Sequence, residues 1–220
     1  MELTEEQEVR RQAFLEWDVE HILPETIESY RFHRIDRQEG RIYYAFGYTD
    51  EETGWEVRVI FDEETMDYMI KTDIRMFSMT NIDLITGNFD AFKQKLPLIL
   101  EKSLRRELID RPISVAIRGR EFTTWDFASV LPETLNGYRR MIAPDHPILG
   151  LNGSYIIALY ENRDTNTGML FFYNLYRGQY YAEKCVKGNP IILHDYDATT
   201  IENFAKILSK RLGKDLEEEA

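Results

Sequence analysis

Residues 14–31 read FLEWDVEHILPETIESYR, and residues 122–139 read FTTWDFASVLPETLNGYR. The two stretches align without a gap at an offset of 108 positions, as from Trp17 to Trp125, and nine positions are identical. Two further positions exchange one aliphatic residue for another. Chance does not produce such an alignment, so the sequence predicts an internal duplication, which has to be recognised before any fold is assigned.

The repeat extends toward the ends of both halves. Two apolar stripes at helical spacing match at an offset of 112 positions, namely Phe92 and Phe204, Leu96 and Leu208, and Leu100 and Leu212. A chain of 220 residues accommodates two domains of common size. We therefore expect a first unit over residues 1–110 and a second over residues 111–220.

Helix signals stand at both ends of each predicted unit. Thr4 and Gln7 have the spacing of a capping box, and the apolar residues that follow predict a helix over residues 5–22, which Pro24 ends. Asn88 is the expected N-cap of a closing helix, in which Pro97 should cause a kink or a restart. In the second unit we expect a short helix over residues 122–130 and a capping box at Thr199-x-x-Glu202 before the last helix.

Between these helices lie short β-like runs separated by polar turns, which favours antiparallel hairpins. The expected strands of the first unit cover residues 29–36, 41–48, 55–61, 66–73 and 79–85, and those of the second cover 137–143, 154–161, 169–176, 179–186 and 190–194. The pattern of each unit therefore predicts an α+β domain: an antiparallel meander sheet of four or five strands with an N-terminal and a C-terminal helix. This order resembles small secretion-chaperone-like domains, a resemblance of fold that implies no function.

Charge separates the two halves. The formal net charge is −12, and counting side chains assigns −11 to residues 1–110 (25 acidic, 14 basic) and −1 to residues 111–220 (14 acidic, 13 basic). An acidic protein repels nucleic acid and anionic membrane surfaces, so we expect neither as a partner. No apolar run approaches a membrane span and the N-terminus has no signal-peptide pattern, while Cys185 is the only cysteine. These features predict a cytoplasmic protein, with Cys185 a buried apolar residue.

Motifs for catalysis or metal binding are missing from the sequence. It contains no nucleotide-binding or hydrolase motif, and its four histidines have no metal-ligand spacing. The acidic residues near positions 50–64 lack the order of a calcium loop and are interpreted as solvated turn residues. We therefore expect no catalytic residue, no metal ligand and no cofactor.

The repeated Leu-Pro-Glu-Thr is interpreted as a structural junction between helix and sheet. Proline fixes the direction of the chain, Glu and Thr cap backbone groups, and the tryptophan and tyrosine of the motif pack helix against sheet. Trp17 and Trp125 are accordingly expected to be largely buried.

Residues 169–181 carry aromatic side chains at consecutive positions. The simpler interpretation is a central strand covered on both faces. The functional interpretation is an exposed aromatic face that binds a protein, because tyrosines at successive strand positions cannot all point inward. The candidate partner-binding residues are Tyr173, Tyr176, Tyr180 and Tyr181.

Two functions are therefore expected. The first is a soluble, non-enzymatic binding or regulatory protein: a pseudo-symmetric duplicated module that contacts a protein partner or a second copy of itself. The alternative is an enzyme or small-ligand receptor with a pocket between the two units, because ligand sites favour domain interfaces.

Overall fold

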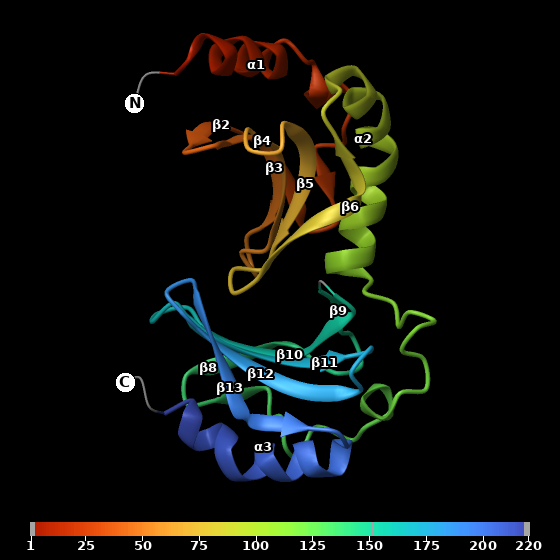
Figure 1. Ribbon diagram of the computed structural model, residues 1–220, viewed down its shortest axis with the longest axis vertical. Helices are drawn as coiled ribbons and strands as arrows, with labels where there is room; N and C mark the ends of the chain where they lie inside the picture. The colour runs from red at the N-terminus through yellow and green to blue at the C-terminus, as the bar shows by residue number, and fades with distance from the viewer. Residues whose placement is uncertain (1–2, 151, 218–220) are drawn as a thin grey trace. The chain divides into compact units, whose positions relative to one another are not determined.

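The computed structural model describes residues 3–150 and 152–217 and divides the chain into two compact units, Met1–Arg106 and Glu107–Ala220. The described residues form an α+β structure with two antiparallel sheets, of six and seven strands, and three α-helices (Figure 1). None of the helices in these residues is long and apolar enough to cross a membrane. The predicted count of four or five strands per sheet was too low, because three of the strands have two residues each and show no periodicity.

The first unit is a six-stranded meander whose strands neighbour one another in chain order. It begins with α1 (Glu5–Leu15) and ends with α2 (Phe89–Leu104), which continues into a π-helical turn at Arg105–Ile109. Its strands are β1 (Thr26–Ile27), β2 (Tyr30–Glu39), β3 (Ile42–Asp50), β4 (Glu56–Asp62), β5 (Asp67–Asp73) and β6 (Ser78–Thr86).

The helix ends of the first unit follow the sequence signals only in part. The Thr4–Gln7 capping box and the Asn88 N-cap are both present. However, α1 ends at Leu15, well before the predicted residue 22, and a 3₁₀ turn at Val19–His21 follows. The guanidinium of Arg34 donates hydrogen bonds to the carbonyl oxygens of Phe14 (2.9 Å) and Trp17 (2.8 Å). These bonds satisfy carbonyls that a longer helix would have paired with its own amides.

Both helices of the first unit pack on one face of its sheet through aromatic side chains. The Phe14 ring of α1 lies 4.9 Å from that of Phe89 in α2 and 5.4 Å from that of Tyr43 in β3. Trp17 contacts Phe46 and Phe92 edge-on and is 7% exposed, so its predicted burial is confirmed. This cluster forms the core that joins helices to sheet. Pro97 lies inside α2 and does not interrupt it.

The second unit has the same meander plus one short additional strand, β9, which pairs with β10. In Figure 1 its long helix, α3, covers one face of the sheet. Its elements are a 3₁₀ turn (Glu121–Thr123), β7 (Thr134–Leu135), β8 (Tyr138–Ile142), β9 (Ile148–Leu149), β10 (Ser154–Asn162), β11 (Thr167–Asn174), β12 (Gln179–Val186), β13 (Asn189–Ala198) and α3 (Ile201–Asp215).

The N-terminal helix predicted for the second unit was wrong. Residues 113–133 form turns and the single 3₁₀ turn instead, because Thr123, Thr124 and their aromatic neighbours have low helix propensity. Trp125 is consequently only half-buried beside the core. The N-cap of α3 is Thr200, which accepts from the backbone N–H of Asn203, so the capping box predicted at Thr199 and Glu202 was wrong and the helix begins one position later.

The Leu-Pro-Glu-Thr stretch folds into the same hairpin in both units. Strand β1 pairs Ile27 with Tyr30, and β7 pairs Leu135 with Tyr138. The tyrosine hydroxyl of the neighbouring long strand then reaches the proline carbonyl: Tyr48 donates to Pro24 and Tyr160 to Pro132, both at 2.6 Å. Burial raises the pKa of both hydroxyls, so they remain protonated donors.

Strand registers also recur between the units. Every residue pair that joins β3 to β4 and β4 to β5 returns in β10–β11 and β11–β12 with both residue numbers raised by 112. For example, Phe61 lies opposite Tyr68, and Tyr173 lies opposite Tyr180. The irregularity in register recurs as well, at position 45 in β3 and position 157 in β10.

Replacing Trp17 by Ala should lower the free energy of unfolding by about 3–5 kcal/mol, because it removes a buried ring from the core. Trp125→Ala should cost less, because that ring is already partly in water. Urea denaturation followed by circular dichroism measures both, with Val115→Ala, at an 81% exposed position, as the control. A loss for Trp17→Ala below about 1 kcal/mol, the size of a surface change, would contradict this packing.

Tyr48→Phe and Tyr160→Phe each delete one hydroxyl and leave a proline carbonyl without its donor. We expect each change to cost about 1–2 kcal/mol in the same denaturation experiment. Tyr176→Phe, which removes a hydroxyl from an exposed ring, is the matched control. If either core variant unfolds like the control, its hydrogen bond does not hold the hairpin in place.

Candidate functional site

The four candidate tyrosines separate into core and surface residues. Tyr173 and Tyr180 are 6% and 2% exposed, with ring centroids 5.0 Å apart, and Tyr180 stacks on Phe204 of α3 at 4.9 Å. Both therefore belong to the core of the second unit. Because they are buried, they cannot contact a partner, and their prediction as partner-binding residues was wrong. Tyr181 is half-buried, and Tyr176 is 80% exposed.

Strand β11 is buried on both faces from Thr167 to Tyr173, as the simpler interpretation of the aromatic run predicted. The exposed tyrosine lies beyond the strand, in the turn that joins β11 to β12. We call residues 174–179 the Tyr176 turn. Its exposure results from turn geometry, whereas strand alternation distinguishes buried Tyr180 from half-buried Tyr181.

Side-chain hydrogen bonds hold the Tyr176 turn. The Asn174 amide donates to the hydroxyl of Ser154 at 2.9 Å and accepts from the backbone N–H of Arg177 at 2.9 Å. The Tyr181 hydroxyl donates to the same Ser154 oxygen at 3.1 Å. The ring of Tyr176 lies so close over Gly153 that a Cβ at residue 153 would overlap it. The exposed ring is thus presented by a fixed turn.

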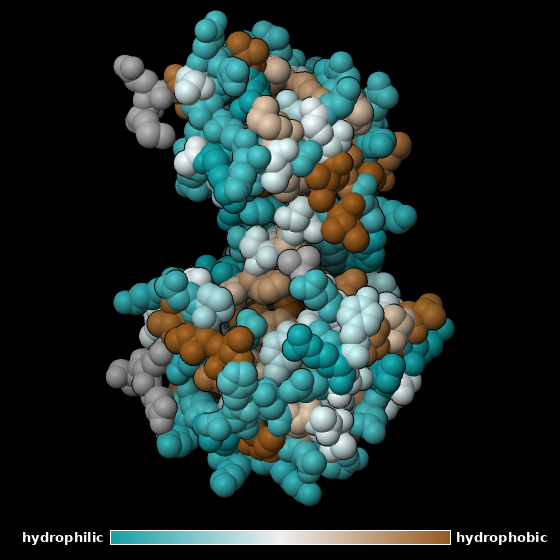
Figure 2. Space-filling model, viewed as in Figure 1, coloured by the Kyte–Doolittle hydropathy of each residue, from teal (hydrophilic) through white to brown (hydrophobic). Residues whose placement is uncertain are grey.

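A second exposed apolar surface lies on β13, the edge strand of this sheet. Ile191 and Ile192 are 52% and 57% exposed. Figure 2 shows that the surface in this view is largely hydrophilic, with separate apolar patches. An open edge can pair with a strand of another chain. Here Pro190 removes one donor, and the shift in register between Leu193 and Ala198 bends the strand. Both features oppose such pairing.

A pocket of about 330 Å³ lies along the edge of β8 in the second unit. Strand β7 pairs only with Tyr138 and Arg139, so among the described residues β8 has β10 as its only strand neighbour from Arg140 onward. The loop of residues 143–147 follows β8 and lines one end of the pocket. Charged side chains dominate the lining: Arg111, Arg139, Arg140, Glu133, Asp145 and His146.

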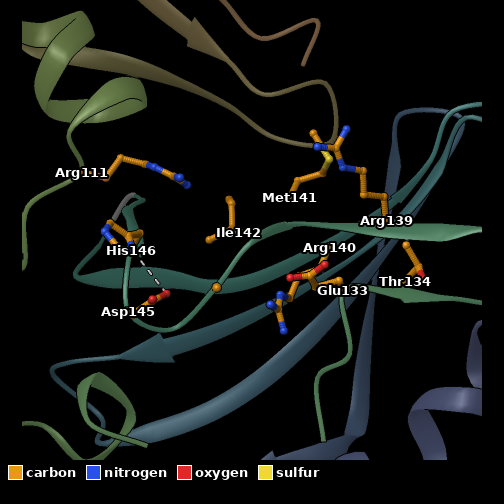
Figure 3. Close-up of a pocket in the computed structure, with 10 residues that line it drawn as sticks. Arg111, Glu133, Thr134, Arg139, Arg140, Met141, Ile142, Asp145 and His146 are labelled. Atoms are coloured by element: carbon orange, nitrogen blue, oxygen red, sulfur yellow. Dashed lines mark ion pairs between the residues drawn. The ribbon is translucent and has the colours of Figure 1, made fainter. Parts of the chain in front are cut away.

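Figure 3 shows how these groups are distributed. Arg111 extends toward His146 at one end, Glu133 lies beside Arg140, and Arg139 projects from β8 in another direction. His146 and Asp145 form an ion pair at 3.3 Å between Nδ1 and Oδ1 when the imidazole is protonated. The pocket therefore combines three guanidinium groups with two carboxylates and one histidine.

Arg140 is held by contacts with neighbouring residues of the second unit. Its guanidinium donates to the carbonyl oxygen of Leu131 and lies 5.0 Å from the centre of the Phe127 ring. Burial raises the pKa of the Tyr160 hydroxyl, and the neighbouring Arg140 opposes that rise. Arg140 therefore bonds both the Leu131 carbonyl and the Tyr160 side chain, which ties the end of β8 to the repeated hairpin.

The equivalent positions of the first unit are built differently. Arg31 and Glu25, which correspond to Arg139 and Glu133, form an exposed ion pair at 3.9 Å. The place of Arg140 is taken by Phe32, whose ring lies 5.6 Å from Phe46 and from Tyr48. The first unit passes from β2 to β3 through a tight turn at Gly40–Arg41, where the second unit has its longer loop.

Sequence analysis missed this pocket. Two differences between the repeated stretches could have indicated it. A second arginine, Arg140, follows Tyr138-Arg139 where the first repeat has Phe32. Four extra residues also precede the next long strand, so the offset between matching residues of the two repeats changes from 108 to 112. The acidic turns that sequence analysis did single out are structural. Asp50 accepts from the backbone N–H of Thr53 at 3.0 Å, and Asn162 accepts from Thr165 at 3.3 Å at the matching position.

Among residues 3–150 and 152–217, no group of three or more histidine, cysteine, aspartate or glutamate side chains is arranged to hold a metal ion. Comparison of the chain with protein-family models, with curated proteins and with solved structures finds no significant match.

Proposed function

We propose that the two units arose by tandem duplication of one α+β module. The gap-free sequence repeat, the shared hairpin with its Tyr–Pro hydrogen bond and the strand registers at a constant offset support this. Convergence on one fold accounts for a common strand order. It does not account for the same irregularity at positions 45 and 157 together with nine identical residues in one motif.

This proposal predicts that residues 14–108 and 122–216 superpose as two copies of one fold. A crystal structure of the full chain measures this directly. We expect the residue pairs of β3–β4 and β10–β11 to keep their common offset, including the irregularity. A different strand order or a different register in either sheet would contradict the duplication.

We propose further that the protein is a non-enzymatic binding or regulatory protein that contacts a protein partner through its second unit. The observation that carries this is the Tyr176 ring, 80% exposed on a turn held by Asn174, Ser154 and Tyr181. Tyrosine offers an apolar face and a hydroxyl, and it is enriched in the cores of protein interfaces. A ring on a fixed turn loses little conformational freedom on binding, which favours affinity.

The charge distribution supports the second unit as the contacting one. Most of the net negative charge lies in the first unit, where it discourages nonspecific contact. The second unit is near neutral, so its surface approaches another protein with less repulsion. Burying one aromatic side chain provides about 1.5–3 kcal/mol, enough for a single anchor residue to matter.

A photo-crosslinking phenylalanine analogue in place of Tyr176 should capture the partner in cells of the native host. The same analogue at Met66, 52% exposed in the corresponding turn of the first unit, is the matched control. For the captured partner, Tyr176→Ser should weaken binding at least about 30-fold, while Met66→Ser leaves it unchanged. Thermal unfolding of both variants should match the wild type.

Crosslinks between two copies of the chain would identify self-association as the contact. Equal capture at positions 176 and 66, or unchanged affinity of Tyr176→Ser, would remove the Tyr176 turn from the interface and contradict the proposed function.

A further inference from the structure

We propose that an extended peptide segment of the protein partner, carrying an acidic side chain, binds along the open edge of β13 where that strand meets α3. A groove of about 500 Å³ lies there. Its lining includes residues 197–199, at the end of β13, and residues of the first turns of α3. The inference rests on the proposed function, because Gln179 belongs both to the groove and to the Tyr176 turn. It names the kind of segment that the partner contributes.

The hairpin between β12 and β13 determines which backbone groups face the groove. Its turn, residues 187–188, has positive φ at both positions, so Val186 and Asn189 close it as a hydrogen-bonded pair. Every second residue of β12 then directs its N–H and C=O toward β13, and Tyr180, an even number of positions before Val186, is one of them. Its partner Ala198 therefore exchanges hydrogen bonds with β12.

Two backbone groups beside Ala198 must point the other way. A trans peptide is planar, with its C=O and N–H on opposite sides, so the C=O of Asp197 and the N–H of Thr199 point away from β12. Among the described residues β12 is the only strand beside β13, and the N–H of Thr199 makes no hydrogen bond within them. One extended segment can bind both groups, as in the addition of a strand to a sheet edge.

The rest of the β13 edge is protected against a long added strand. Pro190 has no N–H to donate, and the register shifts between Leu193 and Ala198. The shift lies on one side of Ala198 and the start of α3 on the other. The open edge therefore fits a short segment, which agrees with the volume of the groove.

The side chains around the groove suit a peptide backbone. Gln179 and Asn203 each carry an amide, which offers both donors and an acceptor. Neither side chain makes a hydrogen bond with another of the described residues. Ile207 is half-buried against the core and supplies an apolar wall. The groove thus offers amide groups for main-chain contacts and an apolar surface for a side chain.

Lys206 gives the groove its preference for an acidic residue. Its side chain is exposed and forms no ion pair with the described residues, including Glu202 one helical turn earlier. The carboxylate of the groove, Asp197, lies 3.1 Å from Nδ1 of His194. An acidic side chain on the bound segment complements Lys206, which α3 holds beside the open edge.

Phage display of short random peptides on the full chain tests the groove without using the partner. We expect enriched peptides that contain aspartate or glutamate and bind with dissociation constants of about 100 μM or tighter in isothermal titration calorimetry. Thr199→Pro removes the outward N–H, and the extended backbone of Ala198 is compatible with a following proline. This variant should bind the peptides at least about tenfold more weakly, whereas Thr199→Ala, which keeps the N–H, should bind them like the wild type.

Lys206→Gln tests the charge at an exposed position. Its matched control is Lys210→Gln, the same change one helical turn further along α3. We expect about threefold or greater weakening for Lys206→Gln and unchanged binding for Lys210→Gln. Thermal unfolding of all four variants should match the wild type. The absence of any enriched peptide, or equal binding of the two variants within either pair, would overturn the proposal.

The groove and the Tyr176 turn can fail separately. The partner captured at position 176 should bind Thr199→Pro at least about tenfold more weakly than the wild type. Unchanged affinity for Thr199→Pro, with weakened affinity for Tyr176→Ser, would overturn the groove and leave the proposed function in place. Peptides that lose affinity for Thr199→Pro, with no partner captured at position 176, would support the groove and contradict the proposed function.

Discussion

The hydrogen bond from a buried tyrosine to a proline carbonyl is the constraint on which each unit depends. Tyr48 and Tyr160 each lie in the long strand beside the repeated hairpin, and each reaches back to the proline that opens it. The bond fixes where the chain enters the sheet, and therefore which residues of the next strand face the helices. A hydrogen bond of this kind contributes about 0.5–1.5 kcal/mol, so the Leu-Pro-Glu-Thr stretch and its distant tyrosine act as one structural element.

Patterns that repeat over several residues made much of this fold predictable. Periodicity predicted strands β3, β4, β5, β10, β11 and β12 and the closing helices α2 and α3. Capping residues predicted the starts of α1 and α2 at Thr4 and Asn88. Features determined by contacts between distant residues could not be predicted in the same way. The early end of α1 depends on Arg34, which lies about twenty positions away, and the two-residue strands exist only because a partner strand is beside them.

The candidate sites also combine features that local sequence patterns predict with features that depend on contacts between distant residues. Alternation along β12 accounts for the burial of Tyr180, but the exposure of Tyr176 depends on a turn held by Ser154 from another strand. The pocket depends on a loop and on the unpaired edge of β8 beyond Arg139. Neither feature produces a periodic pattern in the sequence, so neither could be predicted from one. Both sites lie where the second unit uses a turn or a loop, and such segments tolerate change because few core contacts depend on them.

One strand position shows how the two units differ at the edge of the sheet while both keep the tyrosine–proline hydrogen bond. Phe32 in the first unit contacts two aromatic rings, each contact contributing about 0.5–1.5 kcal/mol beyond buried area. Arg140 at the matching position gives up those contacts. It gains a charge-assisted hydrogen bond to Leu131, of about 1.5–3 kcal/mol, and a contact with the Phe127 ring of about 0.5–1 kcal/mol. Each residue is thus held at this position by contacts of a different kind. The Tyr160–Pro132 bond is present beside Arg140 as the Tyr48–Pro24 bond is beside Phe32, so the hairpin does not depend on which of the two residues stands at this position.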